Sequence, residues 1–129
     1  MTRYYHVDIA QHAAQADAKW VDNLLSHFDV PGVESGRQGV ARRVSTHGVY
    51  HVALIRRLTV ELGATTGRAV SIAQQLLARE GAGAHIPLFV GLEVRLDRSV
   101  FERSVDLAIE EAVESVAPAR RGRPPLRRR

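Results

Sequence analysis

The 129-residue sequence contains no cysteine, which excludes a disulfide scaffold, a thiolate metal site and a thiol redox motif. Lysine is nearly absent too, because 17 of the 18 basic residues are arginines and only Lys19 is a lysine. No segment approaches the ~18 consecutive apolar residues of a membrane helix, and the first residues lack the apolar run of a signal peptide. We therefore expect a cytoplasmic protein with no membrane partner. Hydrophobic residues make up 45% of the chain, which is enough for one folded core.

The formal net charge of +4 is unevenly distributed along the chain. Residues 117–129 hold six arginines and no acidic residue, whereas residues 1–116 have a net charge of −2. Within that body, residues 1–34 carry −3, residues 35–79 carry +6 and residues 80–116 carry −5. Basic segments of this kind indicate surfaces that face a polyanion, and the acidic segment is left for contact with a protein.

Apolar spacing and capping residues predict four helices in the first 81 residues. The third begins at Ser45 or Thr46, with Leu62 among its inward residues, and ends at Gly63. The expected elements, in chain order, are a helix from Val7 to Ala14, a helix at 17–28 capped by Asp17, a Gly-rich loop at 34–39, a β-prone run at 40–44, the third helix, and a helix from Thr65 or Thr66 to Gly81. Two short helices joined by a tight turn and followed by a basic β loop are typical of a winged helix-turn-helix.

The alternation of apolar and polar residues at 88–97 predicts one ten-residue strand with a buried face. The S-x-x-E sequence from Ser99 to Glu102 predicts a capping box that opens a last helix, which Pro118 ends. A lone strand must pair its backbone groups, either with the same strand of a second copy or with the 40–44 run in a monomer. We favour the second copy, because a strand followed by an amphipathic helix is self-complementary.

Four motifs carry a family resemblance. They are Val7-Asp8-Ile9-Ala10, Ala16-Asp17-x-x-Trp20-Val21, Gly36-Arg37-x-Gly39-x-x-Arg42-Arg43 and Val49-Tyr50-x-x-Ala53-Leu54-Ile55-Arg56-Arg57-Leu58-x-x-x-Leu62-Gly63. From Val7 to Leu77 the chain resembles the DNA-binding domain of the MerR superfamily. The resemblance implies that the second helix enters the DNA major groove and that the following loop forms a wing on the backbone. The chain departs from the family in its acidic Asp22-Asn23, in having no effector-binding cysteines, and in lacking the long coiled-coil helix.

The resemblance and the +6 segment together predict the residues that contact DNA. Asparagine can bond adenine bidentately and aspartate can accept from cytosine, so the helix can read bases. The predicted base-reading residues are Lys19, Asp22, Asn23 and Ser26, and the predicted phosphate-binding residues are Arg37, Gln38, Arg42, Arg43, Arg56 and Arg57. The alternative is that these arginines only form a solvated face.

The tail has a second nucleic-acid signal. Arg121-Gly122-Arg123-Pro124, preceded by Arg120, resembles an AT-hook, whose arginines lie along a narrow A·T minor groove. Generic phosphate binding is the alternative.

No catalytic motif is present, and we expect neither a cofactor nor a metal. Of the six histidines, only His47 and His51 have the i, i+4 spacing of helical metal ligands, and no third ligand completes them. We therefore expect both to contact solvent or the DNA backbone. The larger aromatic side chains are expected in the core: Trp20, Phe28, Phe89 and Phe101.

These observations predict a mainly α fold with three parts. They are a winged helix-turn-helix at 1–81, a strand–helix unit at 82–117 that forms a homodimer through residues 86–116, and a disordered Arg-rich tail at 118–129. The expected function is sequence-specific binding of double-stranded DNA by a nucleoid-associated transcriptional regulator, most simply a repressor. The alternatives are an antitoxin or adaptor that binds a protein through the acidic 80–116 segment, and an architectural or excisionase-type DNA-binding protein. Neither operator nor effector follows from the sequence.

Overall fold

The computed structural model of the chain describes residues 2–34, 41–78 and 83–121, with backbone alone at 116–121. The expectation of a mainly α fold is confirmed. The described elements are β1 (Tyr4–His6), α1 (Val7–Ala14), α2 (Ala18–His27), β2 (Val33–Glu34), β3 (Arg43–Ser45), α3 (Thr46–Leu62), α4 (Thr66–Ala78), β4 (Gly83–Phe89), β5 (Leu92–Asp97) and α5 (Arg98–Arg121).

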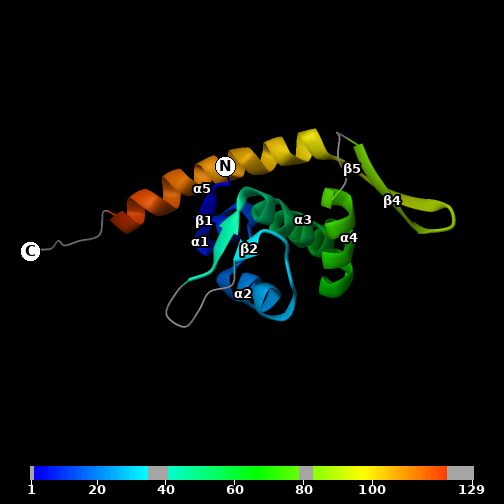
Figure 1. Cartoon of the computed structure of the whole chain (residues 1–129), viewed down its shortest axis with the longest axis horizontal. Helices are drawn as coiled ribbons and strands as arrows, with labels where there is room; N and C mark the ends of the chain where they lie inside the picture. The colour runs from blue at the N-terminus through cyan, green and yellow to red at the C-terminus, as the bar shows by residue number, and fades with distance from the viewer. Residues whose placement is uncertain (1, 35–40, 79–82, 122–129) are drawn as a thin grey trace, which may run out of the picture.

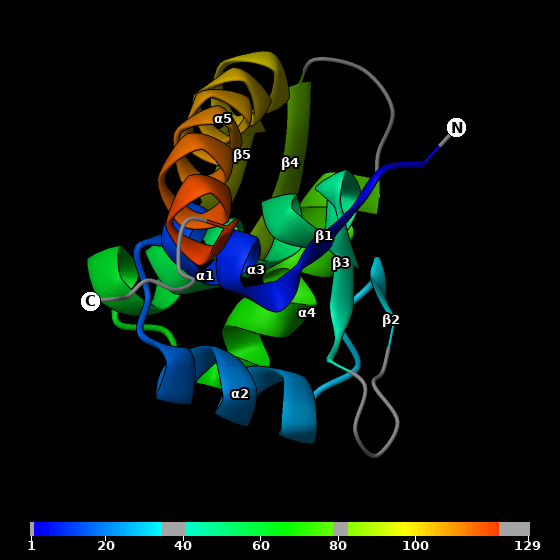
Figure 2. The same ribbon diagram turned by 90° about the vertical axis from the view of Figure 1, so that its left-hand side faces the viewer.

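The helices form layers around α3 (Figures 1 and 2). The long helix α5 lies across α1 and α3 on one side, and α2 lies on the opposite side, at the bottom of Figure 2. A small antiparallel sheet with strand order β1-β3-β2 stands beside these helices. A second antiparallel pair, β4 and β5, projects away from the body at the end where α5 begins (Figure 1).

One apolar cluster joins all of these helices. Val44, Val52 and Ile55 are fully buried at its centre, and α5 adds Val105, Ile109 and Ala112 from the other side. At the base of the β4–β5 pair, Ala84 and Ile86 belong to the same cluster. Each large aliphatic side chain removed from water contributes about 1.5–3 kcal/mol, so the segment after residue 82 is a substantial part of the core.

The predicted caps at Asp17, Ser45 and Gly63 are confirmed, whereas the predicted end of the fourth helix at Gly81 lies outside the described residues. The carboxylate of Asp17 accepts a hydrogen bond from the Trp20 N–H at 2.7 Å, which satisfies a free donor at the start of α2. Ser45 does the same for α3, accepting from the Gly48 N–H at 3.1 Å. At the other end of α3, Gly63 adopts the left-handed conformation with φ of 69°.

The predicted single strand at 88–97 is wrong, because the chain turns back at Val90 and Gly91 to form the β4–β5 hairpin. Away from the turn even-numbered residues face even-numbered ones, as in the pairs Ala84 with Leu96 and Ile86 with Val94, and a register irregularity between Pro87 and Phe89 then sets Phe89 opposite Leu92. Apolar alternation therefore continues unbroken through the turn and mimics one strand. The partner that the strand needed is its own upstream segment, and neither a second copy nor the 40–44 run is required for its pairing.

The predicted ends of the last helix are also wrong. The helix begins at Arg98, where Asp97 caps it by accepting from the Val100 N–H at 3.2 Å. The capping box from Ser99 does not form, since the Glu102 carboxylate instead binds the Arg98 guanidinium at 2.9 Å. The backbone of α5 continues past Pro118 to Arg121, although a proline inside a helix removes one backbone hydrogen bond and its ring crowds the carbonyl four residues earlier. The prediction that Pro118 ends the last helix is therefore wrong, and residues 122–129 of the predicted tail lie outside the described residues.

Some predicted core positions lie at the surface. Leu62 at the end of α3 and Phe89 at the tip of the hairpin are exposed, because the helix and hairpin extend beyond the packed body there. Trp20, Phe28 and Phe101 are half-buried against the core. Val40 of the predicted 40–44 run lies outside the described residues, Ala41 and Arg42 are not strand, and β3 begins at Arg43. The sequence pattern missed the short strands β1 and β2.

Candidate nucleic-acid interface

A tight, hydrogen-bonded turn joins α1 to α2. Gln15 ends α1 in the left-handed conformation, with φ of 57°, and its N–H bonds back to the carbonyls of Gln11 and His12. The chain then reaches the Asp17 cap after one further residue. Val21 and Leu24 anchor one side of α2 in the core. The opposite side of α2 is exposed and presents the four predicted base-reading residues, Lys19, Asp22, Asn23 and Ser26.

The strand pair after α2 is fixed by a close approach of two glycines. Gly32 has φ of 85°, and a Cβ placed there would meet the Gly48 backbone nitrogen at 2.5 Å. The Gly32 carbonyl accepts from the Ser45 N–H at 2.8 Å. Glycine is therefore required on both sides of this contact, which holds the base of the β2–β3 pair against the start of α3.

Arg42 joins the β2–β3 region directly to α2. Its Nη1 donates to the Asp22 carboxylate at 2.8 Å, and its Nη2 donates to the Ser26 hydroxyl at 3.0 Å. Two predicted base-reading residues are thus engaged by one predicted phosphate-binding residue. The sequence offered no signal for this contact beyond opposite charge, because Asp22 and Arg42 are 20 residues apart on different elements.

The other described arginines of the predicted face also have partners. Arg56 lies over the Trp20 ring, with its guanidinium carbon 4.9 Å from the ring centroid. The remaining contacts are Arg57 with Glu61 at 2.8 Å, Arg43 with Glu34 at 3.7 Å, and Arg43 over the Tyr4 ring at 5.1 Å. Exposed ion pairs contribute about 0–1 kcal/mol, so a phosphate group can replace these carboxylates at little cost.

The rest of the predicted DNA-contacting set is not positioned here. Arg37, Gln38, Gly122, Arg123 and Pro124 lie outside the described residues. Arg120 and Arg121 belong to the last turn of α5, and their side chains are outside the description.

The expectation that His51 contacts solvent or DNA is wrong. Its ring is buried in the core, at 1% exposure, because the inward face of α3 includes this position beside Val52 and Ile55. The ring Nδ1 lies 3.0 Å from the His47 carbonyl oxygen, and the two imidazole rings meet edge-on. Burial lowers the pKa of His51 to about 4, with His47 and Arg98 adding repulsion against the extra proton. His47 itself is exposed, as predicted.

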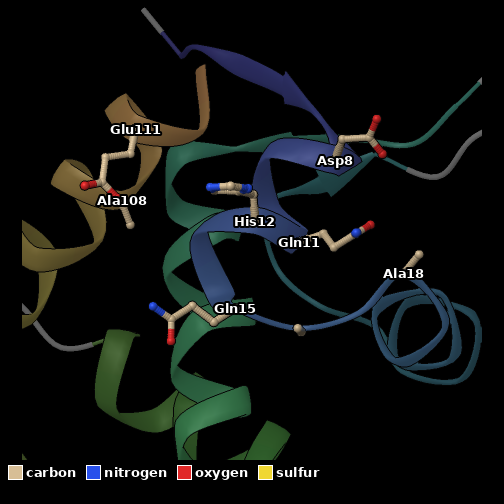
Figure 3. A pocket seen from close by; sticks show the side chains of 8 residues that line it. Asp8, Gln11, His12, Gln15, Ala18, Ala108 and Glu111 are labelled. Carbon is tan, nitrogen blue, oxygen red and sulfur yellow. The ribbon is translucent and has the colours of Figure 1, made fainter. Parts of the chain in front are cut away.

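A shallow hollow of about 640 Å³ lies where α1, the start of α2 and α5 meet. Figure 3 shows that its polar side chains do not converge: Gln11 and Asp8 leave α1 on the side of α2, whereas His12 and Gln15 leave it toward α5. Among the described residues, no group of three histidine, aspartate or glutamate side chains is arranged to hold a metal ion. The same residues include no helix that is long and apolar enough to cross a membrane.

Comparison with known proteins gives no match: no family model, no curated protein and no solved structure resembles this chain closely enough to be significant. The resemblance to the MerR superfamily therefore stays a prediction carried by the motifs alone.

Proposed function

We propose that the protein is a sequence-specific regulator of transcription that binds double-stranded DNA through a winged helix-turn-helix. The observation that supports this most strongly is the exposed polar face of α2. This helix follows the short helix α1 after a tight turn, as the second helix of a helix-turn-helix does. Figure 2 shows α2 on the outside of the molecule, with no described element beneath it. The β2–β3 pair lies next to this face, joined to it through Arg42.

In this proposal α2 lies in the major groove. Asn23 contacts an adenine edge through its amide, and Lys19 contacts a phosphate or a guanine. The β2–β3 loop forms the wing, with Arg37, Gln38 and Arg43 on the phosphates. Arg56 and Arg57 hold the backbone from α3. The Arg-rich C-terminus reaches the neighbouring minor groove, and two copies read a palindromic site as a repressor would.

Selection from random double-stranded DNA tests the proposal, using the full chain and a chain that ends at Ala117. We expect both to enrich the same discrete motif at about 150 mM salt, since α2 supplies the base contacts and the tail only adds affinity. The variant Asn23→Ala should lose about 1–3 kcal/mol of discrimination at one adenine position. Gln75→Ala, an exposed amide on α4, is the matched control and should change nothing.

Three results would contradict the proposal. Failure of both chains to enrich any motif would exclude a DNA-binding regulator and favour the antitoxin or adaptor alternative. A motif that tolerates scrambled A·T sequence and disappears on truncation would favour an architectural protein. Equal discrimination by Asn23→Ala and wild type would remove α2 from base reading.

A further inference from the structure

The β4–β5 hairpin is incomplete as an isolated unit. It is a two-stranded pair that projects from the body (Figure 1), and such pairs are marginally stable without a third strand or a packed face. Its base is anchored by Ala84 and Ile86, but its tip exposes 66% of Phe89 and all of Val90. Leu92, the first residue of β5, is exposed as well.

The two outer edges of this hairpin differ. The β4 strand contains Pro87, which has no N–H to donate, and its register is irregular between Pro87 and Phe89. Both features discourage further pairing along that edge. The β5 strand has neither proline nor irregularity, and it pairs only with β4 in the described part of the chain. The β5 edge is therefore the one on which another strand can add.

We propose that two copies of the chain pair antiparallel through β5, giving a four-stranded sheet with strand order β4-β5-β5-β4. Centred on Val94, this pairing sets Glu93 of each copy opposite the partner's Arg95, on the exposed face. Both oppositely charged pairs then form at once. On the other face, Leu92 lies opposite the partner's Leu96. Cross-strand pairs of this kind contribute roughly 0.2–1 kcal/mol each.

Charge selects this register over its neighbours. If the pairing is centred on Glu93, two glutamates face each other; if it is centred on Arg95, two arginines do, and Glu93 faces the partner's Asp97. Like charges directly opposite are destabilising. A shift by one residue between the strands would turn the apolar face of one copy to solvent.

The same register covers the exposed apolar tip. It sets the turn at Val90 opposite the partner's residue 98, where α5 begins. Val100, in the first turn of α5, is 58% exposed and can pack against Phe89 and Val90 of the partner. The exposed apolar residues at both ends of β5 thus find cover in one symmetric contact.

This inference gives an interface to the homodimer of the proposed function. It rests on that function only in the statement that the dimer binds a palindromic DNA site. The test measures mass without DNA, by sedimentation equilibrium of the full chain. Wild type should approach twice 14.2 kDa as its concentration rises. Glu93→Arg alone and Arg95→Glu alone should each weaken association by at least about tenfold, because attraction becomes repulsion at two positions.

Charge restoration separates pairing from general damage. The double variant Glu93→Arg/Arg95→Glu should recover the dimer, and mixing the two single variants should give heterodimers. Val60→Arg, a change at an exposed apolar residue of α3, should leave the mass unchanged.

The inference is overturned if wild type remains monomeric, if the single charge changes leave the dimer intact, or if the mixture fails to associate. It is also overturned if Leu107→Arg alone separates the copies, because Leu107 lies on the outer face of α5 and its exposure would then mark the interface. Each of these results leaves the DNA selection unaffected, so the two proposals fail separately.

Discussion

Lowering the pH from 7 to 5 should destabilise the protein through one residue, His51. Its ring is inside the core and its Nδ1 faces the His47 carbonyl oxygen at 3.0 Å. Burial keeps this imidazole neutral in the folded protein and lowers its pKa to about 4, whereas the unfolded chain has the ordinary value near 6.5. Between these two values the unfolded state binds more protons than the folded state, so acid favours unfolding.

The size of the effect follows from the two pKa values. Stability from His51 is fully present above pH 6.5 and is lost as the pH falls toward 4. Between pH 7 and pH 5 the loss is about 2 kcal/mol, and over the whole range it is about 3 kcal/mol. A small domain has a total stability of roughly 5–15 kcal/mol, so this loss is large enough to measure.

Urea unfolding at pH 7 and pH 5 measures this difference. The variant His51→Gln should lose the His51 part of the pH dependence, while His85→Gln, at an exposed position on β4, should keep it. The His51 C2–H resonance should not shift between pH 7 and pH 5. A resonance that titrates near pH 6.5, or an equal pH dependence in wild type and His51→Gln, would refute the reasoning.

Three further changes test other parts of the structure. Asp22→Asn removes the carboxylate charge that pairs with Arg42. Fluorescence anisotropy measures non-specific DNA binding at several salt concentrations, and the slope of log K against log salt should steepen by about one unit. An unchanged slope would exclude Arg42 from phosphate contact. Gly48→Ala places a Cβ 2.7 Å from the Gly32 carbonyl oxygen and should lower the unfolding free energy in urea by about 1–3 kcal/mol, and a neutral result would show that the loop can move aside. Tyr50→Phe removes a 2.7 Å hydrogen bond to the Asp106 carboxylate on α5 and should cost about 1 kcal/mol in thermal unfolding; an unchanged unfolding temperature would show that this contact does not stabilise the fold.

The helices of the first half could be predicted because their determinants are local. Asp17 and Ser45 each bond an N–H three residues ahead, and Gly63 needs only its own backbone freedom. Apolar stripes on α2, α3 and α4 repeat within a few turns of a single helix. Nothing in these signals depends on residues far away in the chain.

The hairpin and the arginine contacts could not be predicted because their determinants are not local. The pairing of Ile86 with Val94 preserves alternation across the turn, so a period of two fits one strand and a hairpin equally well. Similarly, Arg42 meets Asp22 only after the β2–β3 pair has folded beside α2. The net charge of residues 35–79 therefore predicts a basic surface there. It does not show that acidic residues of another segment, such as Asp22, neutralise some of these arginines.

In the proposed function, these acidic partners decide how much of the affinity for DNA comes from the predicted DNA face and how much from the C-terminal segment. The described residues of the predicted DNA face include five cationic side chains and three carboxylates that touch them, a net charge of +2: Lys19, Arg42, Arg43, Arg56 and Arg57 against Asp22, Glu34 and Glu61. The C-terminal segment at 117–129 has six arginines and contains no acidic residue. In the proposed function, non-specific affinity for DNA follows the number of phosphates neutralised, so we expect the C-terminal segment to supply most of it. In the same proposal, a face with little net charge binds DNA weakly wherever the bases do not match, and this weak binding at wrong sites would let α2 discriminate between sequences.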